Sequence, residues 1–278
     1  MKRVITGALW TVMLGIMWYF QGTVMRVILS AMMIEGMREM YCAYEKHGDH
    51  TYWWPGMLFA VLAMPAYVYL GWEAACVLLL LCCILGMTCV ILHGRADFSA
   101  LVATVFPLLY PGMLFLLLFR MQDFQVARYS SLAMLMVFLV PAACDVAAYE
   151  VGSRVGKRKL CPELSPGKTV EGAAAGLVAA IVVSGLISCV YPALQGLARE
   201  LPEAVMPPVW QMLILGAAAG FAAQIGDLVA SLIKRRCGIK DYAQILPGHG
   251  GLMDRMDSSL LCTVAVFGYF WVFSQVIA

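Results

Sequence analysis

Charged residues are scarce in this sequence of 278 residues. Asp, Glu, Lys and Arg together make up 13% of the chain, and 62% of the residues are hydrophobic. Typical soluble domains contain roughly 25% charged residues. A water-soluble chain of this length could not bury so much apolar surface, which excludes an ordinary soluble enzyme. The formal net charge is only +2, and we expect no nucleic-acid partner.

Other features are also missing. The ten cysteines form no Cys-x-x-Cys pair and no disulfide-like spacing, so we interpret them as small buried hydrophobic residues. The start, Met1-Lys2-Arg3 before an apolar run, resembles a signal peptide, but no small-x-small cleavage site follows. We therefore expect a retained first span. No internal repeat, low-complexity tract or soluble domain is visible.

Long apolar runs dominate the sequence instead. Crossing the hydrocarbon core takes about 20 helical residues. Eight runs are strong candidates: 4–20, 53–70, 72–92, 101–119, 131–149, 173–190, 210–233 and 260–278. A ninth run, 23–41, carries two acidic and two basic residues, so it is either a span packed inside the bundle or an interfacial amphipathic helix. The pattern predicts an all-α, polytopic transmembrane helix bundle of about nine spans, or eight if 23–41 is interfacial.

The placement of Lys and Arg predicts the topology. Cytoplasmic loops are enriched in these residues. With nine spans and a cytoplasmic N-terminus, most basic residues outside the spans fall on one side, in the segments 2–3, 45–50, 93–97, 152–168 and 234–255. We divide the chain into N-terminal transmembrane helices, 1–128, and a C-terminal catalytic transmembrane region, 129–278. Its cytoplasmic polar loops, 152–172 and 234–257, should meet where the chemistry takes place.

One predicted span carries a polar stripe. Helical spacing places Gln224, Asp227, Ser231 and Lys234 on one face. Asp227 lies about two turns before Lys234, and an acidic residue inside a span needs a cation, a partner or a water-filled cavity. Taken alone, a packing contact with another helix explains Asp227 as well as a functional role does.

The loop after this span combines glycines, acids and bases. In the run 247–251, Pro-Gly-His-Gly-Gly, glycines remove Cβ atoms and permit positive φ, so backbone amides can approach an anion. Asp254 and Asp257 lie three residues apart and can face one site, and carboxylates with substrate phosphates and water are the ligands that Mg²⁺ prefers. His249 alone is more often an ordinary loop histidine, and between glycines a hydrogen bond to phosphate is favoured over acid–base work. Bases that could hold phosphate are Lys234, Arg235, Lys240 and Arg255.

The loop 152–172 repeats the same residue types. Asp145 and Tyr149 lie about one helical turn apart at the end of the preceding span. The segment from Ser165 to Thr169 leads into an apolar helix whose first amides can bind an anion. Helix capping and the positive-inside rule explain the serine and the lysines by themselves. They do not explain a second concentration of these residues on the same side.

Three motifs in the second half of the chain resemble the signature of the phosphatidate cytidylyltransferase (CDP-diacylglycerol synthase) family. The longest matches from Ser231 to Asp257 without a mismatch: Ser231-x-x-Lys234-Arg235-x4-Lys240-Asp241-x-Ala243-x2-Leu246-Pro247-x-His249-Gly250-Gly251-x-x-Asp254-Arg255-x-Asp257. The other two are Asp145-x-x-Ala148-Tyr149-x-x-Gly152 and Ser165-Pro166-x-Lys168-Thr169-x-Glu171-Gly172. One departure is Gly167, where the family usually has a second lysine, which leaves Lys168 as the phosphate contact.

The resemblance implies transfer of the cytidylyl group from CTP to phosphatidic acid, giving CDP-diacylglycerol and pyrophosphate for phospholipid synthesis. It implies a protein of the bacterial inner membrane whose active site faces the cytoplasm. The lipid phosphate is already an anionic nucleophile, so alignment and charge neutralisation suffice. The implied cofactor is Mg²⁺, and a second cation and a homodimer are left open.

The resemblance also implies roles for individual residues. Mg²⁺ would be held by Asp227 and Asp254, with Asp257 a weaker candidate, while Lys168, Lys240 and Arg255 would offset charge on the leaving pyrophosphate. Ser231 would ligate metal or position the lipid phosphate. The catalytic set is Asp227, Ser231, Lys168, Lys240 and Asp254, and the substrate-binding set is Ser165, Thr169, Lys234, Arg235, Asp241, His249, Gly250, Gly251, Arg255, Asp145 and Tyr149.

Two alternatives are weighed against this interpretation. A related CTP-using membrane enzyme, such as a polyprenol kinase, would transfer the γ-phosphoryl group and release CDP. An ion-coupled transporter would also place acidic residues in the membrane, but it would show charges near the midplane and broken helices in paired halves. Here the polar residues gather on one predicted face and no repeat is seen, which disfavours a transporter.

Overall fold

The computed structural model describes residues 22–93, 97–122, 129–197, 206–243 and 250–277, and Gly15. Two short strands, β1 (Lys159–Cys161) and β2 (Ser165–Thr169), pair antiparallel, with Lys159 opposite Thr169 and Cys161 opposite Ser165. The helices are α2 (Thr23–His47), α3 (Trp53–Leu70), α4 (Trp72–Leu92), α5 (Phe98–Pro107), the π-helix η1 (Leu108–Met113), α6 (Leu114–Met121), α7 (Ser130–Val155), α8 (Val170–Leu197), α9 (Val209–Arg236) and α10 (Met253–Ile277).

Apolar side chains cover the outside of the helices as well as the contacts between them. Leu80, Ile84 and Ile91 are exposed on α4, and Val178 and Val182 are exposed on α8. A helix that is hydrophobic all round belongs in a protein core or in a membrane. Since these faces lie on the outside, the medium around them is lipid. The chain is a polytopic helical membrane protein, as the sequence predicts.

Seven helical segments of the described residues are long and apolar enough to cross a membrane. They correspond to seven of the eight strong candidate runs, and the remaining run, 4–20, lies outside the described residues. The charged run 23–41 forms part of one continuous helix, α2, which is not among the seven. Whether α2 spans the membrane stays a prediction, as does the count of nine.

The chain groups into two compact units. Unit 1 comprises Met1–Arg120 and Ile233–Met256, and unit 2 comprises Met121–Leu232 and Asp257–Ala278. The last turn of α9 and the first turn of α10 thus belong to unit 1, and the rest of both helices belongs to unit 2. The predicted division into 1–128 and 129–278 stays a prediction.

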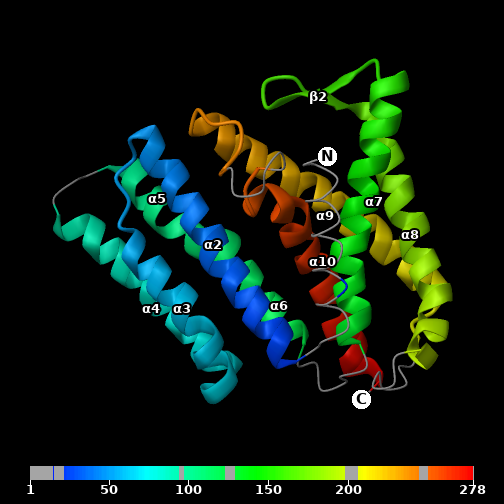
Figure 1. The fold of residues 1–278 in the computed structure, drawn as a ribbon, viewed down its shortest axis with the longest axis horizontal. Coiled ribbons are helices and arrows are strands. Elements are labelled where there is room, and N and C mark those ends of the chain that lie inside the picture. The colour runs from blue at the N-terminus through cyan, green and yellow to red at the C-terminus, as the bar shows by residue number, and fades with distance from the viewer. Residues whose placement is uncertain are drawn as a thin grey trace. The chain divides into compact units, whose positions relative to one another are not determined.

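In unit 1, α2 packs against α3, and α3 pairs with α4 (Figure 1). The turn between α3 and α4 is a single residue, Gly71, whose φ of +94° suits glycine. Gly56 on α3 lets the Tyr41 ring of α2 approach the backbone, and the Tyr41 hydroxyl donates a hydrogen bond of 3.0 Å to the Thr104 carbonyl. The predicted span 101–119 is kinked, because Tyr110 between α5 and α6 has non-helical φ and ψ.

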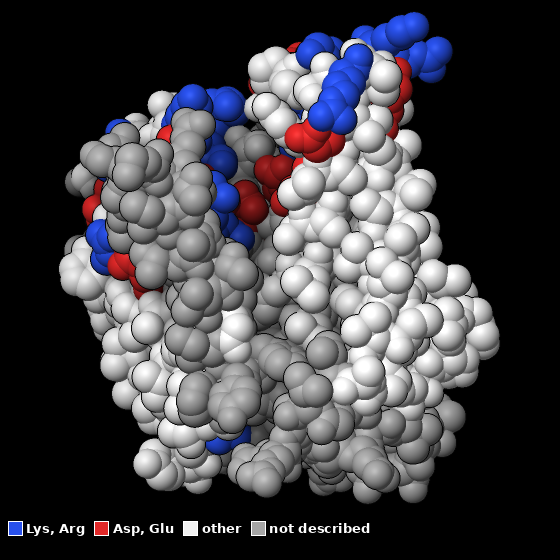
Figure 2. Space-filling model, turned by 45° about the vertical axis from the view of Figure 1, so that its right-hand side comes forward, with Lys and Arg blue, Asp and Glu red and all other residues white. Residues whose placement is uncertain are grey.

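In unit 2, α7 and α8 lie side by side and the β1–β2 hairpin connects their neighbouring ends (Figure 1). Small residues allow the close packing, since a Cβ on Gly176 of α8 would lie 2.8 Å from the Cys144 carbonyl oxygen of α7. The charged side chains of this unit gather at the hairpin end, while the sides of the helices below are uncharged (Figure 2). Charged side chains gather where helices leave the hydrocarbon core of a membrane. The distribution therefore indicates that the helices of unit 2 leave the core at the hairpin end.

Candidate active site

A pocket of about 370 Å³ lies at the hairpin end of unit 2. Its lining comes from α7, the hairpin, the start of α8, and α9. Six residues of the predicted site line this pocket: Asp145, Tyr149, Ser165, Lys168, Thr169 and Asp227. Residues from two of the three motifs are therefore assembled around one cavity with Asp227 of the polar stripe, whereas no described residue of the motif from Ser231 to Asp257 lines it.

The central contact in the pocket is an ion pair between Lys168 of β2 and Asp227 of α9. The two side chains are 28% and 25% exposed, so the pair is partly open to solvent. An acidic residue inside a span needs a cation, a partner or a water-filled cavity, and Asp227 has both a partner and a cavity. A partly exposed pair at a pocket wall can exchange its contacts with a charged ligand.

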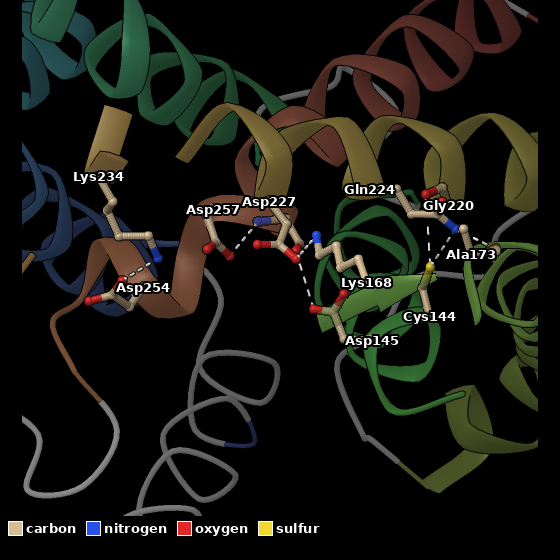
Figure 3. Close-up of polar contacts among 11 residues, drawn as sticks. Cys144, Asp145, Lys168, Ala173, Gly220, Gln224, Asp227, Lys234, Asp254 and Asp257 are labelled. Atoms are coloured by element: carbon tan, nitrogen blue, oxygen red, sulfur yellow. Dashed lines mark hydrogen bonds and ion pairs between the residues drawn. The ribbon is translucent and has the colours of Figure 1, made fainter. Parts of the chain in front are cut away.

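Two further carboxylates lie near this pair. Asp145 of α7 accepts a hydrogen bond of 3.2 Å from the Ser258 hydroxyl of α10, and Asp257 accepts one of 2.7 Å from the Ser258 amide. The side chains of Asp145, Lys168 and Asp227 point toward one another (Figure 3). The side of unit 2 that faces the pocket is therefore rich in acidic groups, with Lys168 as the base among the residues that line it.

Close packing of α9 on α10 brings Asp227 and Asp257 into the same region. A Cβ on Gly226 would lie 2.4 Å from the Asp257 carbonyl oxygen, a distance that real Cβ atoms do not show. Glycine at this position is thus required by the approach of the two helices. The neighbouring residue, Asp227, is placed by that approach.

The hairpin is anchored at both of its ends. The Glu171 carboxylate at the start of α8 accepts hydrogen bonds from the amides of Lys157, at 3.1 Å, and Arg158, at 3.2 Å. The Thr169 hydroxyl is buried and accepts a hydrogen bond of 3.1 Å from the Gly172 amide. Thr169 therefore caps α8, a role that the capping interpretation of this loop gave to its serine. Lys168, the residue before Thr169 in β2, is held in place by these contacts.

Gln224 is a residue of the pocket that is absent from the predicted site. Its side-chain amide donates a hydrogen bond of 2.8 Å to the Ala173 carbonyl of α8 and lies 3.4 Å from the Cys144 sulfur. Its place on the polar stripe with Asp227 is the signal that could have identified it. Ser231, buried one turn beyond Asp227, is not among the residues that line this pocket. All ten cysteines are free, but the prediction that they are buried is confirmed for only five of them, since four are partly exposed and Cys189 is exposed.

A second Lys–Asp pair lies in unit 1. The Lys234 ammonium contacts Oδ1 of Asp254 at 2.7 Å (Figure 3), and the two side chains are only 13% and 6% exposed. Oδ2 of Asp254 accepts hydrogen bonds of 2.9 Å from the amides of Tyr242 and Gly251. Lys234 also lies 5.6 Å from the centre of the Tyr242 ring. The Asp254 carboxylate thus ties the loop after α9 to the first turn of α10.

The remaining predicted residues of unit 1 are near its surface. The side chains of Arg235, Lys240, Asp241 and Arg255 are exposed. Gly250 has a φ of +79°, and Gly251 is buried. His249 lies outside the described residues. The roles of all these residues in substrate binding stay predictions.

The donor chemistry of unit 2 fits a divalent cation. Among the described residues no three His, Cys, Asp or Glu side chains are grouped as a ready-made metal cage. Magnesium, however, usually takes one or two carboxylates and completes its coordination with phosphate oxygens and water. Asp145 and Asp227 at the pocket, against the single Lys168, leave an excess of negative charge that a cation would offset.

Comparisons with known proteins identify relatives. The model of the cytidylyltransferase family matches residues 1–273. The phosphatidate cytidylyltransferase of Haemophilus influenzae is 36% identical over 169 residues, covering 60% of this chain and 56% of that protein. The phosphatidate cytidylyltransferase of Bacillus subtilis is 45% identical over 126 residues, covering 45% and 42% of the two chains. In these two alignments the chain spans about half the length of its relative.

A third relative aligns over nearly the whole chain. The phosphatidate cytidylyltransferase of Helicobacter pylori strain J99 is 30% identical over 260 residues, which is 93% of this chain and 87% of that protein. The similarity therefore includes the N-terminal helices, for which the motifs of the second half give no information.

Proposed function

Because this chain belongs to the cytidylyltransferase family, we propose that it transfers the cytidylyl group of CTP to phosphatidic acid. An oxygen of the lipid phosphate attacks the α-phosphorus of CTP and forms the new P–O bond. The bond from the α-phosphorus to the oxygen that bridges to the β-phosphorus breaks, and pyrophosphate leaves with that electron pair. The names of the three relatives support this choice of donor and acceptor.

The Lys168–Asp227 pair at the pocket carries the proposal. A lipid kinase and a cytidylyltransferase both need charge neutralisation, and the nucleophile here needs no strong base because the phosphate oxygen is already anionic. Lys168 supplies a positive charge at the end of the helices where the lipid headgroup and the aqueous phase meet. Its ammonium would neutralise charge that develops on the departing pyrophosphate.

Magnesium, when bound, would neutralise the triphosphate and orient its oxygens for in-line displacement. In unit 2, Asp227 is the carboxylate best placed to hold it, with Asp145 at the same pocket and Asp257 on the neighbouring helix. Asp254 is also proposed from the sequence, although its oxygens contact Lys234 and two backbone amides. Both oxygens of Asp254 are therefore already engaged, and Asp254 is less available to a metal ion than Asp227.

The lipid substrate can reach the pocket without leaving the bilayer. Tyr149 lines the pocket and is 73% exposed, and the nearby Val146 on α7 is 64% exposed. An amphipathic ring beside an apolar face is typical of the membrane interface. The acyl chains would stay along the outer face of α7 while the phosphate enters beside Lys168.

The topology follows from the same charges. The hairpin end of unit 2 carries several lysines and arginines, which favours its placement in the cytoplasm. CTP is a cytoplasmic nucleotide in bacteria, so this orientation gives the pocket access to both substrates. We propose the inner membrane as the site of the protein, with CTP and phosphatidic acid as its partners.

A double-label assay tests the proposal. Purified protein in detergent is incubated with phosphatidic acid, Mg²⁺ and CTP labelled either in the α- or in the γ-phosphate, and the lipids are then extracted. We expect α-label in the lipid fraction, γ-label only in pyrophosphate, and loss of both signals with EDTA that is reversed by added Mg²⁺. Transfer of γ-label into a lipid acceptor would replace the proposal by a lipid kinase, and no transfer of either label would refute CTP-dependent chemistry.

A further inference from the structure

Glu39 is a buried acidic residue that none of the three motifs contains. It lies on α2 of unit 1 and is 1% exposed. Its carboxylate oxygens accept hydrogen bonds of 2.8 Å from the amides of Leu252 and Met253, at the start of α10. Burying a carboxylate costs free energy unless hydrogen bonds or charges compensate it. These two contacts therefore explain why an acid is tolerated in the N-terminal half of the chain.

The start of α10 needs such an acceptor. The first amides of a helix lack intrahelical partners and are usually capped by the side chain of the preceding residue. Here that residue is Leu252, whose carbonyl accepts from the amides of Arg255 and Met256 and whose side chain has no oxygen. Glu39 supplies the missing acceptor from another helix, and its negative charge is favoured at a helix N-terminus.

Glycines on both sides permit this contact. A Cβ on Gly251 would lie 2.5 Å from a carboxylate oxygen of Glu39, and a Cβ on Gly36 would lie 3.2 Å from the Met253 sulfur. From the sequence, Gly251 is expected to let a backbone amide approach a bound anion. In the structure the anionic group that lies against Gly251 is the Glu39 carboxylate of the protein itself. The Gly251 amide donates its hydrogen bond to Asp254.

We propose that Glu39 is a positioning residue that holds Gly251 to Met256, and thereby Asp254 and Arg255, in the conformation used for nucleotide binding. It acts through this segment and does not touch the reacting atoms. The nucleotide part rests on the proposed function and on the role at the departing pyrophosphate that the family resemblance implies for Arg255. The structural part, that Glu39 fixes the start of α10, is independent of that function.

Hydrogen exchange tests the structural part. We compare Glu39→Gln with Glu35→Gln, a matched change one turn away on α2, where Glu35 pairs with the exposed Arg38. A carboxamide keeps one acceptor but turns an NH₂ group toward the second amide, so exchange of the peptide 250–256 should rise about tenfold in Glu39→Gln. Glu35→Gln should match wild type, and Glu39→Asp, which keeps the charge, should lie between the two.

Equal exchange in Glu39→Gln and wild type would overturn the proposal. If Glu39→Gln does not fold, Gly251→Ala provides the same comparison, because its Cβ meets the Glu39 carboxylate. A folded Gly251→Ala protein with unchanged exchange would then overturn the proposal.

Steady-state kinetics test the nucleotide part. We expect Glu39→Gln to raise the KM for CTP about tenfold while kcat and the KM for phosphatidic acid stay within about twofold of wild type, since one charge-assisted hydrogen bond is lost. Glu39→Asp should recover part of the affinity. Raised exchange with an unchanged KM for CTP would refute the link to nucleotide binding. Absence of transfer by the wild-type protein would instead refute the proposed function and leave the exchange result to decide the role of Glu39.

Discussion

Two Lys–Asp pairs of this chain share their chemistry and differ in their surroundings. Lys168 and Asp227 of unit 2 are 28% and 25% exposed and line a pocket, whereas Lys234 and Asp254 of unit 1 are 13% and 6% exposed. Asp254 is further bound by two backbone amides. A partly exposed pair can release its partners to a ligand, while breaking a buried pair leaves an uncompensated charge. Both aspartates are paired, so pairing alone does not tell them apart, but from the difference in burial we expect Asp227 rather than Asp254 to exchange its partner for a ligand.

Removing the charge of Asp227 should give the largest effect on catalysis. Asp227→Asn keeps the shape of the side chain but loses the charge that pairs with Lys168. We expect CDP-lipid formation to fall on the order of a thousandfold, as for loss of a major electrostatic contact, with unchanged elution and melting in detergent. The matched control is Glu150→Gln, which removes a carboxylate from an exposed ion pair with Arg154 in the same unit. Wild-type turnover in Asp227→Asn would exclude this residue from the mechanism.

Removing the charge of Asp254 should mainly affect stability. Asp254→Asn leaves the Lys234 ammonium buried without its counter-charge, so the free energy of unfolding should fall by about 3 kcal/mol. Denaturant titration in detergent measures this loss. Asp241→Asn, which changes an exposed aspartate of the same unit, should stay within about 0.5 kcal/mol of wild type. A fully stable but inactive Asp254→Asn protein would reverse the comparison and make Asp254 a metal ligand.

Separating α9 from α10 tests whether packing positions the pocket. In Gly226→Ala the new Cβ would meet the Asp257 carbonyl oxygen, and overpacking of this kind typically costs about 1–3 kcal/mol. We expect a lower melting temperature together with lower turnover, because Asp227 is the next residue. Gly268→Ala is the control on α10, since nothing lies within 4 Å of its Cβ. If both variants behave alike, the close approach of the helices does not position the site.

Adding the second lysine of the family motif should give the smallest effect. Gly167 has open space around its Cβ and lines the pocket, so Gly167→Lys can be accommodated. One exposed charge near the nucleotide should lower the KM for CTP about two- to fivefold without changing stability. Gly167→Ala should leave the KM unchanged. A higher KM in the lysine variant would show that the triphosphate does not bind beside this residue.

Local structure around the pocket was only partly predictable. The segment 152–172 is expected to be a polar loop, yet residues 159–161 and 165–169 within it form a hairpin. Its conformation depends on Glu171, which binds the amides of Lys157 and Arg158, and on Thr169, which caps α8. Such contacts join residues that no helical or strand period relates, so a pattern search along the sequence does not find them.

The amino-acid sequence by itself determined the membrane location and the seven candidate spans of the described residues, because these features depend on hydrophobicity. It also determined that Asp227 lies on a polar stripe, because that feature depends on the helical period. Only the tertiary structure decided which acid pairs with which base, and that Glu39 rather than a neighbouring side chain caps α10. The physical reason is that a carboxylate takes its role from the groups that surround it after packing. Residues far apart in the chain supply those groups.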